Sequence, residues 1–472
     1  MNQAHRSGWT LAITSVAFFM VALDALVVTT ALPVIGRDLH AGMTTLQWTV
    51  NTYGLTYAAV IITAAALGDR YGRRAVFMAG LAVFTVASAG CALAPSVAAL
   101  LAARTVQGVG AAAVMPLSLT ILTRAFPPQR RGAIVGIWGG LGGLAVAAGP
   151  LVGGAVTQGL DWHWIFWVNV PIGLAALALS GARLPESRGQ AVRLDVPGVA
   201  LLTGGVFALV WGLVRAGEVG WGAAQTVVVL ALGLALVAGF VAWERRTATP
   251  LLPPRLFRVR DVAAANASAF LMSGAVTASA FLIAQYCQLV LGYSPLGTGL
   301  HLLPWTATPL LIAPVAGRLS DRIGRRPVLA TGLLLQAVGL GWFALLADGR
   351  PHYATLVAPL VVAGIGISMA LPTAATAAIN AVRPEEMGKA SGTNSTLQRL
   401  GAVFCVAIAT TVFTAAGGTA TTFAAGFRPA LEIVAAMSLL GVGTASALHG
   451  RHASRSASAP AARLVDAGSP TA

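Results

Sequence analysis

Two ionisable residues, Asp24 and Arg104, lie inside long apolar runs of the sequence, where a charge is costly. A carboxylate at the centre of a membrane-spanning helix costs about 2.5–3.5 kcal/mol and normally faces a cavity or a partner. At a rise of about 1.5 Å per residue, Asp24 lies about 20 Å along the run at residues 10–32, and Arg104 about 10 Å from the start of the run at residues 98–122. We therefore predict that the two side chains lie at similar depth, face one cavity and interact directly or through water.

The chemistry that this pair could perform is reversible proton binding. A neighbouring guanidinium favours the charged form of a carboxyl group, whereas removal from water favours the neutral form. A change in the distance between Asp24 and Arg104 would therefore load and unload a proton. Gln107, one helical turn after Arg104, is expected to join them. Two structural alternatives stay open: a permanently neutral, hydrogen-bonded Asp24, and an Arg104 held by backbone carbonyl groups.

The elements that must position these residues are membrane-length helices. The 472-residue chain is 57% hydrophobic and only 10% charged, with a mean hydropathy of +0.78, whereas soluble domains carry about a quarter charged residues. Apolar runs of about 20 residues, long enough to cross a bilayer, recur throughout. We predict an all-α membrane protein with fourteen transmembrane spans, at residues 10–32, 46–67, 75–94, 98–122, 133–156, 163–181, 196–214, 223–243, 262–290, 298–316, 328–347, 354–378, 391–415 and 429–448.

The net charge of the chain, +15 at pH 7, follows this predicted topology. With the N-terminus in the cytoplasm, 24 of the 30 lysine and arginine residues fall in the termini and in the connections on the cytoplasmic side. Membrane proteins carry such an excess of basic residues in their cytoplasmic loops, next to anionic lipid. Both termini are therefore predicted to be cytoplasmic, in a multi-pass protein of the cell membrane. The basic balance requires no nucleic-acid partner.

A short basic turn occurs twice, as GDRYGRR at residues 68–74 and as SDRIGRR at residues 320–326. A solvated turn would explain one copy, but two copies at corresponding places between apolar runs indicate an internal duplication. Such repeats place a substrate site between the two halves, near the middle of the bilayer. We predict a six-helix bundle at residues 1–182, a linker with two extra transmembrane helices at 183–260, a second six-helix bundle at 261–450, and a disordered cytoplasmic tail at 451–472.

The charged residues of the two turns are predicted to form a gate at the cytoplasmic face. Asp69 can pair with a helix end because carboxylates favour helix N-termini, and the arginines can bind lipid and form ion pairs. The second copy is expected to keep a weaker version of this role. The predicted gating residues are Asp69, Arg70, Arg73, Arg74, Asp321, Arg322, Arg325 and Arg326.

Further polar residues lie inside the predicted spans. Because polar groups in lipid must be satisfied within the protein, each could line a substrate cavity or join two helices by a hydrogen bond, and both possibilities stay open. The candidates for the substrate cavity are Asn51, Tyr53, Gln107, Tyr286, Gln288, Asn394, Gln398 and Arg399.

The group Gly149, Pro150, Gly153 and Gly154 predicts a helix that can bend and pack closely. Proline removes a backbone hydrogen bond, and glycine lets a neighbouring helix approach. A kinked helix that serves only for packing is the structural alternative.

The sequence lacks motifs for nucleotide or metal chemistry. It has no phosphate-cradling Gly-rich loop followed by Lys and Ser or Thr, so ATP is not expected to supply the energy. Its histidines and three cysteines show no metal-ligand spacing. We therefore expect no metal and no cofactor, with a proton gradient as the energy source. A membrane enzyme or lipid-handling protein is disfavoured for the same reason, and the duplicated halves disfavour a channel.

The two basic turns resemble the loop signature of the major facilitator superfamily, and fourteen spans point to its drug/proton antiporter branch. Residues 104–111 (RTVQGVGA) resemble the fourth-helix motif of that branch, and residues 149–154 (GPLVGG) resemble its fifth-helix antiporter motif. Residues 23–33 and 162–171 resemble its first-helix and sixth-helix signatures. The chain departs from the family pattern at Ala65 and Ala145, where glycine is usual.

This resemblance implies a proton-coupled antiporter, not an enzyme, that exports hydrophobic or cationic drugs and other small molecules by alternating access. The alternative is an exporter dedicated to one endogenous metabolite, such as a self-made antibiotic. The implied partners are the lipid bilayer, a small-molecule substrate and protons, and the chain is expected to act as a monomer. The basic turns would stabilise the outward-facing state, and the fifth-helix motif would seal the pathway.

Overall fold

The computed structural model describes residues 3–188, 195–247, 250, 254–347, 351–382 and 387–449. Its regular elements are α1 (Gln3–Asp38), α2 (Met43–Tyr71), α3 (Arg73–Ala92), α4 (Val97–Ala125), α5 (Pro128–Gly159), α6 (Trp164–Trp167), α7 (Asn169–Arg183), α8 (Val196–Val219), α9 (Ala224–Glu244), the short 3-10 helix η1 (Pro254–Arg258), α10 (Arg260–Leu289), α11 (Pro295–Thr306), α12 (Thr308–Ile323), α13 (Arg325–Leu346), α14 (Tyr353–Asn380), α15 (Met387–Ala415) and α16 (Phe423–Ser446). The predicted tail at residues 451–472 lies outside the described residues.

The prediction of fourteen spans is wrong. Within the part of the chain that the structure describes, twelve helices are long and apolar enough to cross a membrane. The two predicted runs without a counterpart among the twelve, residues 46–67 and 133–156, fall on α2 and α5. Both are helices, but several of their side chains lie outside the described residues. An apolar run predicts a helix without establishing that the helix crosses the bilayer.

Two of the predicted runs are divided in the structure. The run at residues 163–181 contains α6 and α7, which meet at Val168. The run at residues 298–316 contains parts of α11 and α12, which meet at Ala307. Pro309 lies in the first turn of α12, where the missing proline N–H costs no helical hydrogen bond.

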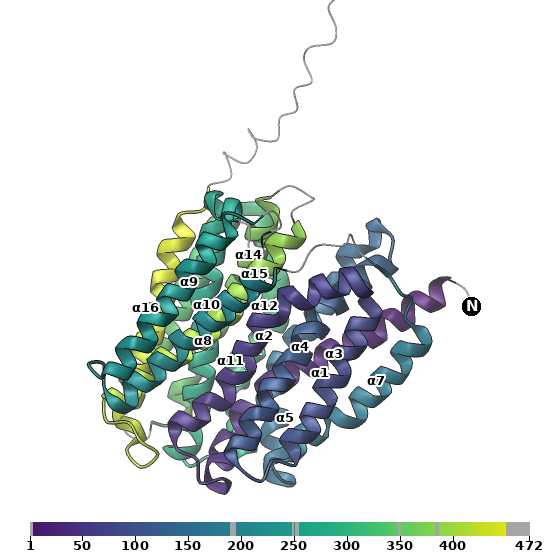
Figure 1. The fold of residues 1–472 in the computed structure, drawn as a ribbon. Coiled ribbons are helices and arrows are strands. Elements are labelled where there is room, and N and C mark those ends of the chain that lie inside the picture. The colour runs from purple at the N-terminus through teal and green to yellow at the C-terminus, as the bar shows by residue number, and fades with distance from the viewer. Residues whose placement is uncertain are drawn as a thin grey trace, which may run out of the picture.

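The helices fall into two halves that correspond to the two copies of the basic turn (Figure 1). The first half contains α1 to α7 and the second half α10 to α16. In Figure 1 the purple and blue helices of the first half lie to the right, and the green and yellow helices of the second half lie to the left. Contacts between the halves run mainly through α5 with α11 and through α2 with α15.

The buried core shows where the halves meet. At the end of the bundle that holds the α1–α2 connection, which we call the far end, one cluster contains residues of both halves, including Leu32, Trp162 and Phe427. At the opposite, basic end, which holds the two basic turns, each half has its own cluster, around Phe77 in the first and Leu329 in the second. The halves are therefore packed together at the far end and have separate cores at the basic end.

The helices α8 and α9 form a hairpin that packs against both halves. Buried side chains of α8, such as Val206 and Val210, meet Leu55 of α2 and Val403 of α15 in one cluster. Asp195 begins the hairpin, because its carboxylate accepts the Gly198 N–H at 3.0 Å and so caps α8. The hairpin therefore lies over the seam between α2 and α15.

Candidate functional site

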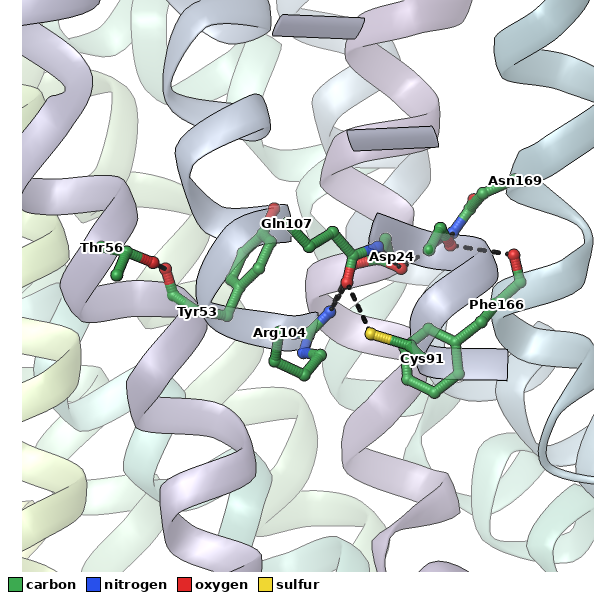
Figure 2. A network of polar contacts seen from close by, with 9 residues as sticks. Asp24, Tyr53, Thr56, Cys91, Arg104, Gln107, Phe166 and Asn169 are labelled. Atoms are coloured by element: carbon green, nitrogen blue, oxygen red, sulfur yellow. Dashed lines mark hydrogen bonds and ion pairs between the residues drawn. The ribbon is translucent and has the colours of Figure 1, made fainter. Parts of the chain in front are cut away.

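The central polar cluster of the first half joins three helices around Asp24 (Figure 2). Arg104 Nη1 of α4 lies 2.7 Å from Asp24 Oδ2 of α1. The Nε2 group of Gln107 donates to Asp24 Oδ1 at 3.0 Å, and Asn169 Nδ2 of α7 donates to the same oxygen at 2.8 Å. All four side chains are at most 3% exposed. The predicted meeting of Asp24 and Arg104 is thus present in the structure as a direct ion pair.

Close helix packing holds the ion pair in place. Gly108, next to Gln107, lies so near α2 that a Cβ atom there would be 2.5 Å from the Tyr53 carbonyl oxygen. Gly110, two residues further and on the other side of α4, would place a Cβ atom 2.5 Å from the backbone nitrogen of Phe84 in α3. These glycines let α4 approach α2 and α3. Arg104 can therefore reach α1 from the centre of the first half.

Besides Asp24, Arg104 contacts two aromatic rings and the side-chain amide of Gln107. Its guanidinium lies 4.2 Å from the centre of the Tyr53 ring and 5.8 Å from that of Phe166. Its Nη1 also donates to Gln107 Oε1 at 2.8 Å, while its Nε has no hydrogen-bond partner. Arginine interacts favourably with aromatic faces. The guanidinium is thus held by one carboxylate, one amide and two aromatic rings. When the carboxyl group is neutral, the amide and the rings still contact the guanidinium, but they hold it more weakly.

Asn169 is a member of the cluster that sequence reasoning missed as a site residue. It begins α7, directly after the break from α6, and its amide also donates to Ser88 Oγ at 3.1 Å. The available signal was an asparagine within the run at residues 163–181, because a buried amide in a membrane helix needs a partner. Its aromatic neighbours in the sequence gave no indication that the partner is on α1.

Replacing Asn169 by alanine is expected to lower the transport rate about 10-fold without preventing folding. A hydrogen bond to a charged group contributes about 1.5–3 kcal/mol, and each 1.36 kcal/mol is a tenfold change in rate. Initial rates of substrate transport in proteoliposomes, at equal protein content, measure the effect. Ser88→Ala is the matched variant, because it removes the neighbour of Asn169 and leaves every hydrogen bond to Asp24 in place. Equal rates for Asn169→Ala and wild type would contradict a role for this amide.

The predicted cavity residues of the second half form a separate polar group on α10 and α15. Asn394 donates to Asn266 Oδ1 at 2.9 Å, and Gln398 donates to Asn394 Oδ1 at 2.6 Å. Arg399 points to the first half, with its guanidinium 4.4 Å from the centre of the Tyr57 ring. Gln288 also crosses between the halves, because its amide donates to the carbonyl oxygen of Thr30 at 2.6 Å.

Two predicted cavity residues are placed elsewhere. Tyr286 is fully buried in the far-end core, where its ring stacks on Phe427 at 4.2 Å and its hydroxyl donates to the Ala347 carbonyl oxygen at 3.1 Å. Asn51 is also fully buried, and neither polar atom of its side chain has a partner. Tyr286 therefore lies in the far-end core, and Asn51 forms no hydrogen bond with the Asp24 cluster.

The first basic turn is an ordered structure and not a solvated loop. Gly72 has a φ angle of +116°, which favours glycine and lets α3 begin directly after α2. Arg73 Nε donates to Asp69 Oδ1 at 2.8 Å. The Glu186 carboxylate, from the segment after α7, accepts the backbone N–H groups of Arg74 and Ala75 at 3.0 and 3.1 Å. It thereby caps the N-terminus of α3.

The second turn repeats this backbone geometry. Gly324 has a φ angle of +99° between α12 and α13. Arg322 and Arg326 are exposed and Arg325 is half-buried, whereas the side chain of Asp321 lies outside the described residues. In the first turn, Arg70 is exposed and lies 5.3 Å from the centre of the Tyr71 ring. The two copies thus share their backbone but not, within the described residues, the carboxylate cap.

The Gly149–Pro150–Gly153–Gly154 group contacts two different helices. Gly153 faces α1 within the first half, because a Cβ atom there would lie 2.5 Å from the Val27 carbonyl oxygen. Gly154 faces α11 of the second half, and a Cβ atom there would collide with the Pro295 carbonyl oxygen. In return, a Cβ atom at Gly299 of α11 would lie 2.7 Å from Leu151 Cα and would meet the Pro150 carbonyl oxygen. This motif therefore forms a close contact between the halves.

Two helical halves with a buried ion pair in one of them are the architecture of a secondary membrane transporter. The family model described as Major Facilitator Superfamily matches residues 14–255 and 265–466. The chain belongs to this superfamily, and it is a multi-pass membrane transporter and not an enzyme.

Its relatives include resistance and export proteins. The chain is 37% identical over 395 residues to the Tetracenomycin C resistance and export protein of Streptomyces glaucescens, across 83% of this chain and 73% of the relative. It is also 37% identical over 411 residues to the Multidrug resistance protein Stp of Mycobacterium tuberculosis, across 86% and 76%. A crystal structure of a POT family transporter shares the fold, with a TM-score of 0.70, 15% identity, and coverage of 92% of this chain and 94% of that one. The chain is an exporter akin to these drug and antibiotic resistance proteins.

Proposed function

We propose that this protein is a proton-coupled antiporter that exports hydrophobic small molecules from the cytoplasm by alternating access. The carboxylate of Asp24 carries this proposal, because it is buried at 3% exposure and is held by Arg104, Gln107 and Asn169. A buried acid paired with a single cation is the arrangement that couples a proton to a change in structure.

The coupling follows from the energetics of the ion pair. Removing one partner of a buried pair costs about 3–5 kcal/mol, because the other charge is left uncompensated. Separation of Arg104 from Asp24 is therefore coupled to proton uptake by the carboxyl group. Renewed contact expels that proton. A movement that changes the distance between α1 and α4 thus binds a proton on one side of the membrane and releases it on the other.

We infer from the packing of the two halves that this conformation is the inward-facing step of the proposed cycle. The basic end is expected to face the cytoplasm, because it holds an excess of arginine residues and cytoplasmic loops of membrane proteins carry such an excess. The halves share a core at the far end and have separate cores at the basic end, so the far end is closed and the protein faces inward. In this state the first turn pairs within its own half, through Arg73 and Asp69. We infer that its charges are released for contacts with the second half in the outward-facing state.

Uphill transport in proteoliposomes tests the proposal. A pH gradient imposed across vesicles that contain the purified protein should drive accumulation of a substrate against its concentration gradient. A protonophore should abolish the accumulation. For a neutral substrate, a membrane potential of the right sign should also drive accumulation, because the exchange of a proton for a neutral molecule moves one net positive charge. Accumulation that persists after the pH difference has collapsed, with no other ion gradient present, would exclude proton coupling.

Arg104→Ala is expected to lower proton-driven transport at least about 100-fold, because it removes the cation of the buried pair. Arg104→Lys keeps the charge but loses the planar contact with Tyr53, so it should retain part of the activity. The rate of proton movement on addition of substrate measures both variants. Arg428→Gln, at an exposed arginine of α16 that pairs with Glu432, is the control. A fully active Arg104→Ala variant would refute the role of the ion pair.

A dedicated exporter of one metabolite is the second candidate. The Streptomyces relative favours it, because that protein is named for resistance to and export of a single compound, tetracenomycin C. The two candidates differ in substrate range and not in mechanism. Expression in a host that lacks its own efflux pumps, followed by a growth assay against chemically unrelated toxins, separates them. Resistance to one chemical class alone supports the dedicated exporter, and resistance to several classes supports the multidrug pump.

A further inference from the structure

We propose that Arg399 makes the substrate site between the halves selective for organic anions, specifically aromatic molecules that carry a carboxylate or a phenolate. The inference rests on the proposed transport function and names its substrate class. It depends on the balance of charge near the centre of the bundle and on the position of Arg399 at the seam between α2 and α15.

The negative charge of Asp24 is fully engaged within the protein. Its two carboxylate oxygens accept three hydrogen bonds, and the ion pair with Arg104 is 2.7 Å long. A cationic substrate could use this carboxylate only by displacing Arg104 into a buried setting without a counter-ion, which is costly. Every other aspartate and glutamate of the sequence lies near the end of an apolar run or in a connection.

Arg399 is a positive charge without such compensation. No carboxylate within the described residues lies at ion-pair distance from it. Its guanidinium lies 4.4 Å from the centre of the Tyr57 ring and also forms a hydrogen bond with the Tyr57 side chain. Its side chain is half-buried. Together with the neutral Asp24–Arg104 pair, Arg399 makes the net charge of the central residues positive. An anion is the ligand that balances it.

The neighbours of Arg399 add the features of a ligand site. The Arg399 guanidinium forms one hydrogen bond with the Tyr57 side chain, and the remaining N–H groups of its planar fork can donate to a carboxylate. Thr396, three residues earlier and on the same face of α15, has a fully buried hydroxyl without a partner. The rings of Tyr57 and Tyr53 are buried, at 3% and 4% exposure, and their centres lie 6.4 Å apart. A flat aromatic acid is the ligand that uses all of these groups.

The position of Arg399 lies on the route from the cytoplasm. From the basic-end start of α15, Arg399 is about 18 Å along the helix, whereas Arg104 is about 32 Å from the basic-end terminus of α4. The halves have separate cores at this end. A substrate that arrives from the cytoplasm therefore meets Arg399 before it reaches the Asp24 cluster.

A comparison of three dyes of similar size tests the proposal: fluorescein as the anion, rhodamine 6G as the cation and a BODIPY hydrocarbon dye as the neutral molecule. Equilibrium binding to the purified protein and pH-driven uptake into proteoliposomes are both measured. The wild type should prefer fluorescein to rhodamine 6G. Arg399→Gln should weaken fluorescein binding about 10- to 100-fold, the range expected for a charge-assisted hydrogen bond, and should leave the neutral dye unchanged.

Two further variants complete the test. Arg399→Lys should fall between the wild type and Arg399→Gln, because lysine keeps the charge but not the planar geometry. Arg428→Gln removes an exposed arginine and should behave as the wild type. Size-exclusion elution and thermal unfolding establish that each variant is folded.

Several results would overturn the inference: stronger binding of rhodamine 6G than of fluorescein by the wild type, no detectable fluorescein binding, or an equal loss of both dyes in Arg399→Gln. The proposed function is judged separately. Uptake of rhodamine 6G in preference to fluorescein, if it needs a pH gradient and is lost in Asp24→Asn, would leave the antiporter intact and refute the anion site.

Discussion

Asp24→Asn should abolish proton-driven uphill transport, with accumulation falling to the level of empty vesicles. Asparagine has almost the size of aspartate, so it can still accept a hydrogen bond from Arg104, but it cannot bind and release a proton. It also leaves the buried Arg104 without a counter-ion, which costs about 3–5 kcal/mol. The measurement is substrate-dependent proton flux in proteoliposomes with an imposed pH gradient.

The control for this variant is Glu432→Gln, which removes an exposed carboxylate of α16 that pairs with Arg428. It should transport at the wild-type rate. Asp24→Glu keeps a titratable group and should retain part of the activity. Asp24→Asn must also reach the membrane in wild-type amounts, as judged by immunoblotting. Normal accumulation by a correctly inserted Asp24→Asn variant would disprove the assignment of this carboxyl group as the proton carrier.

Gly154→Val is expected to reduce transport about 100-fold by preventing closure of the far end. The new Cβ atom would collide with the Pro295 carbonyl oxygen of α11, and it would also lie 2.8 Å from Leu296 Cα. Because both obstacles are backbone atoms, the two helices must move apart, and a displacement of about 1 Å can cost about 100-fold in rate. Uptake of substrate at equal protein content measures the loss.

A second measurement distinguishes this mechanism from simple misfolding. Thr30→Cys, in a chain whose three native cysteines are replaced by alanine, places a thiol at the buried contact between α1 and α10. Gly154→Val should increase its labelling by a membrane-impermeant maleimide added outside. Gly159→Val, in the last turn of the same helix with nothing within 4 Å of the new Cβ atom, is the control. Unchanged labelling and transport in Gly154→Val would mean that the contact tolerates separation.

The ion pair was predictable because charge inside an apolar run is a strong signal. Asp24 and Arg104 could be placed at one depth from helical rise alone, and the structure joins them directly. Asn169 gave a weaker signal, because amides in membrane helices serve packing as often as chemistry. Tyr286 gave an ambiguous signal: its polar group suggested a cavity, and in the structure its ring lies in an aromatic cluster while its hydroxyl donates to a backbone carbonyl oxygen.

The duplicated halves were also predictable, since the repeated basic turn marks them, whereas the number of spans was not. Runs of apolar residues predict α2 and α5 as helices, but they overstate the count of spans, which is twelve within the described residues. The contact of Gly154 with α11 could not be predicted, because it joins residues that are distant in sequence and depends on how the halves meet. The same holds for the cap that Glu186 provides to α3.

In the proposed alternating-access cycle, the hairpin of α8 and α9 is expected to move together with one of the two halves. Toward the second half it makes a directional bond, from the Thr411 hydroxyl to the Leu213 carbonyl oxygen at 3.1 Å. Toward the first half it packs through apolar side chains, against Leu55 and against Trp48, whose ring centre lies 5.6 Å from that of Trp211. Ring faces can glide over one another, whereas a hydrogen bond weakens steeply once its angle is lost. We therefore expect the hairpin to move with the second half and to change its position relative to Trp48 of the first half.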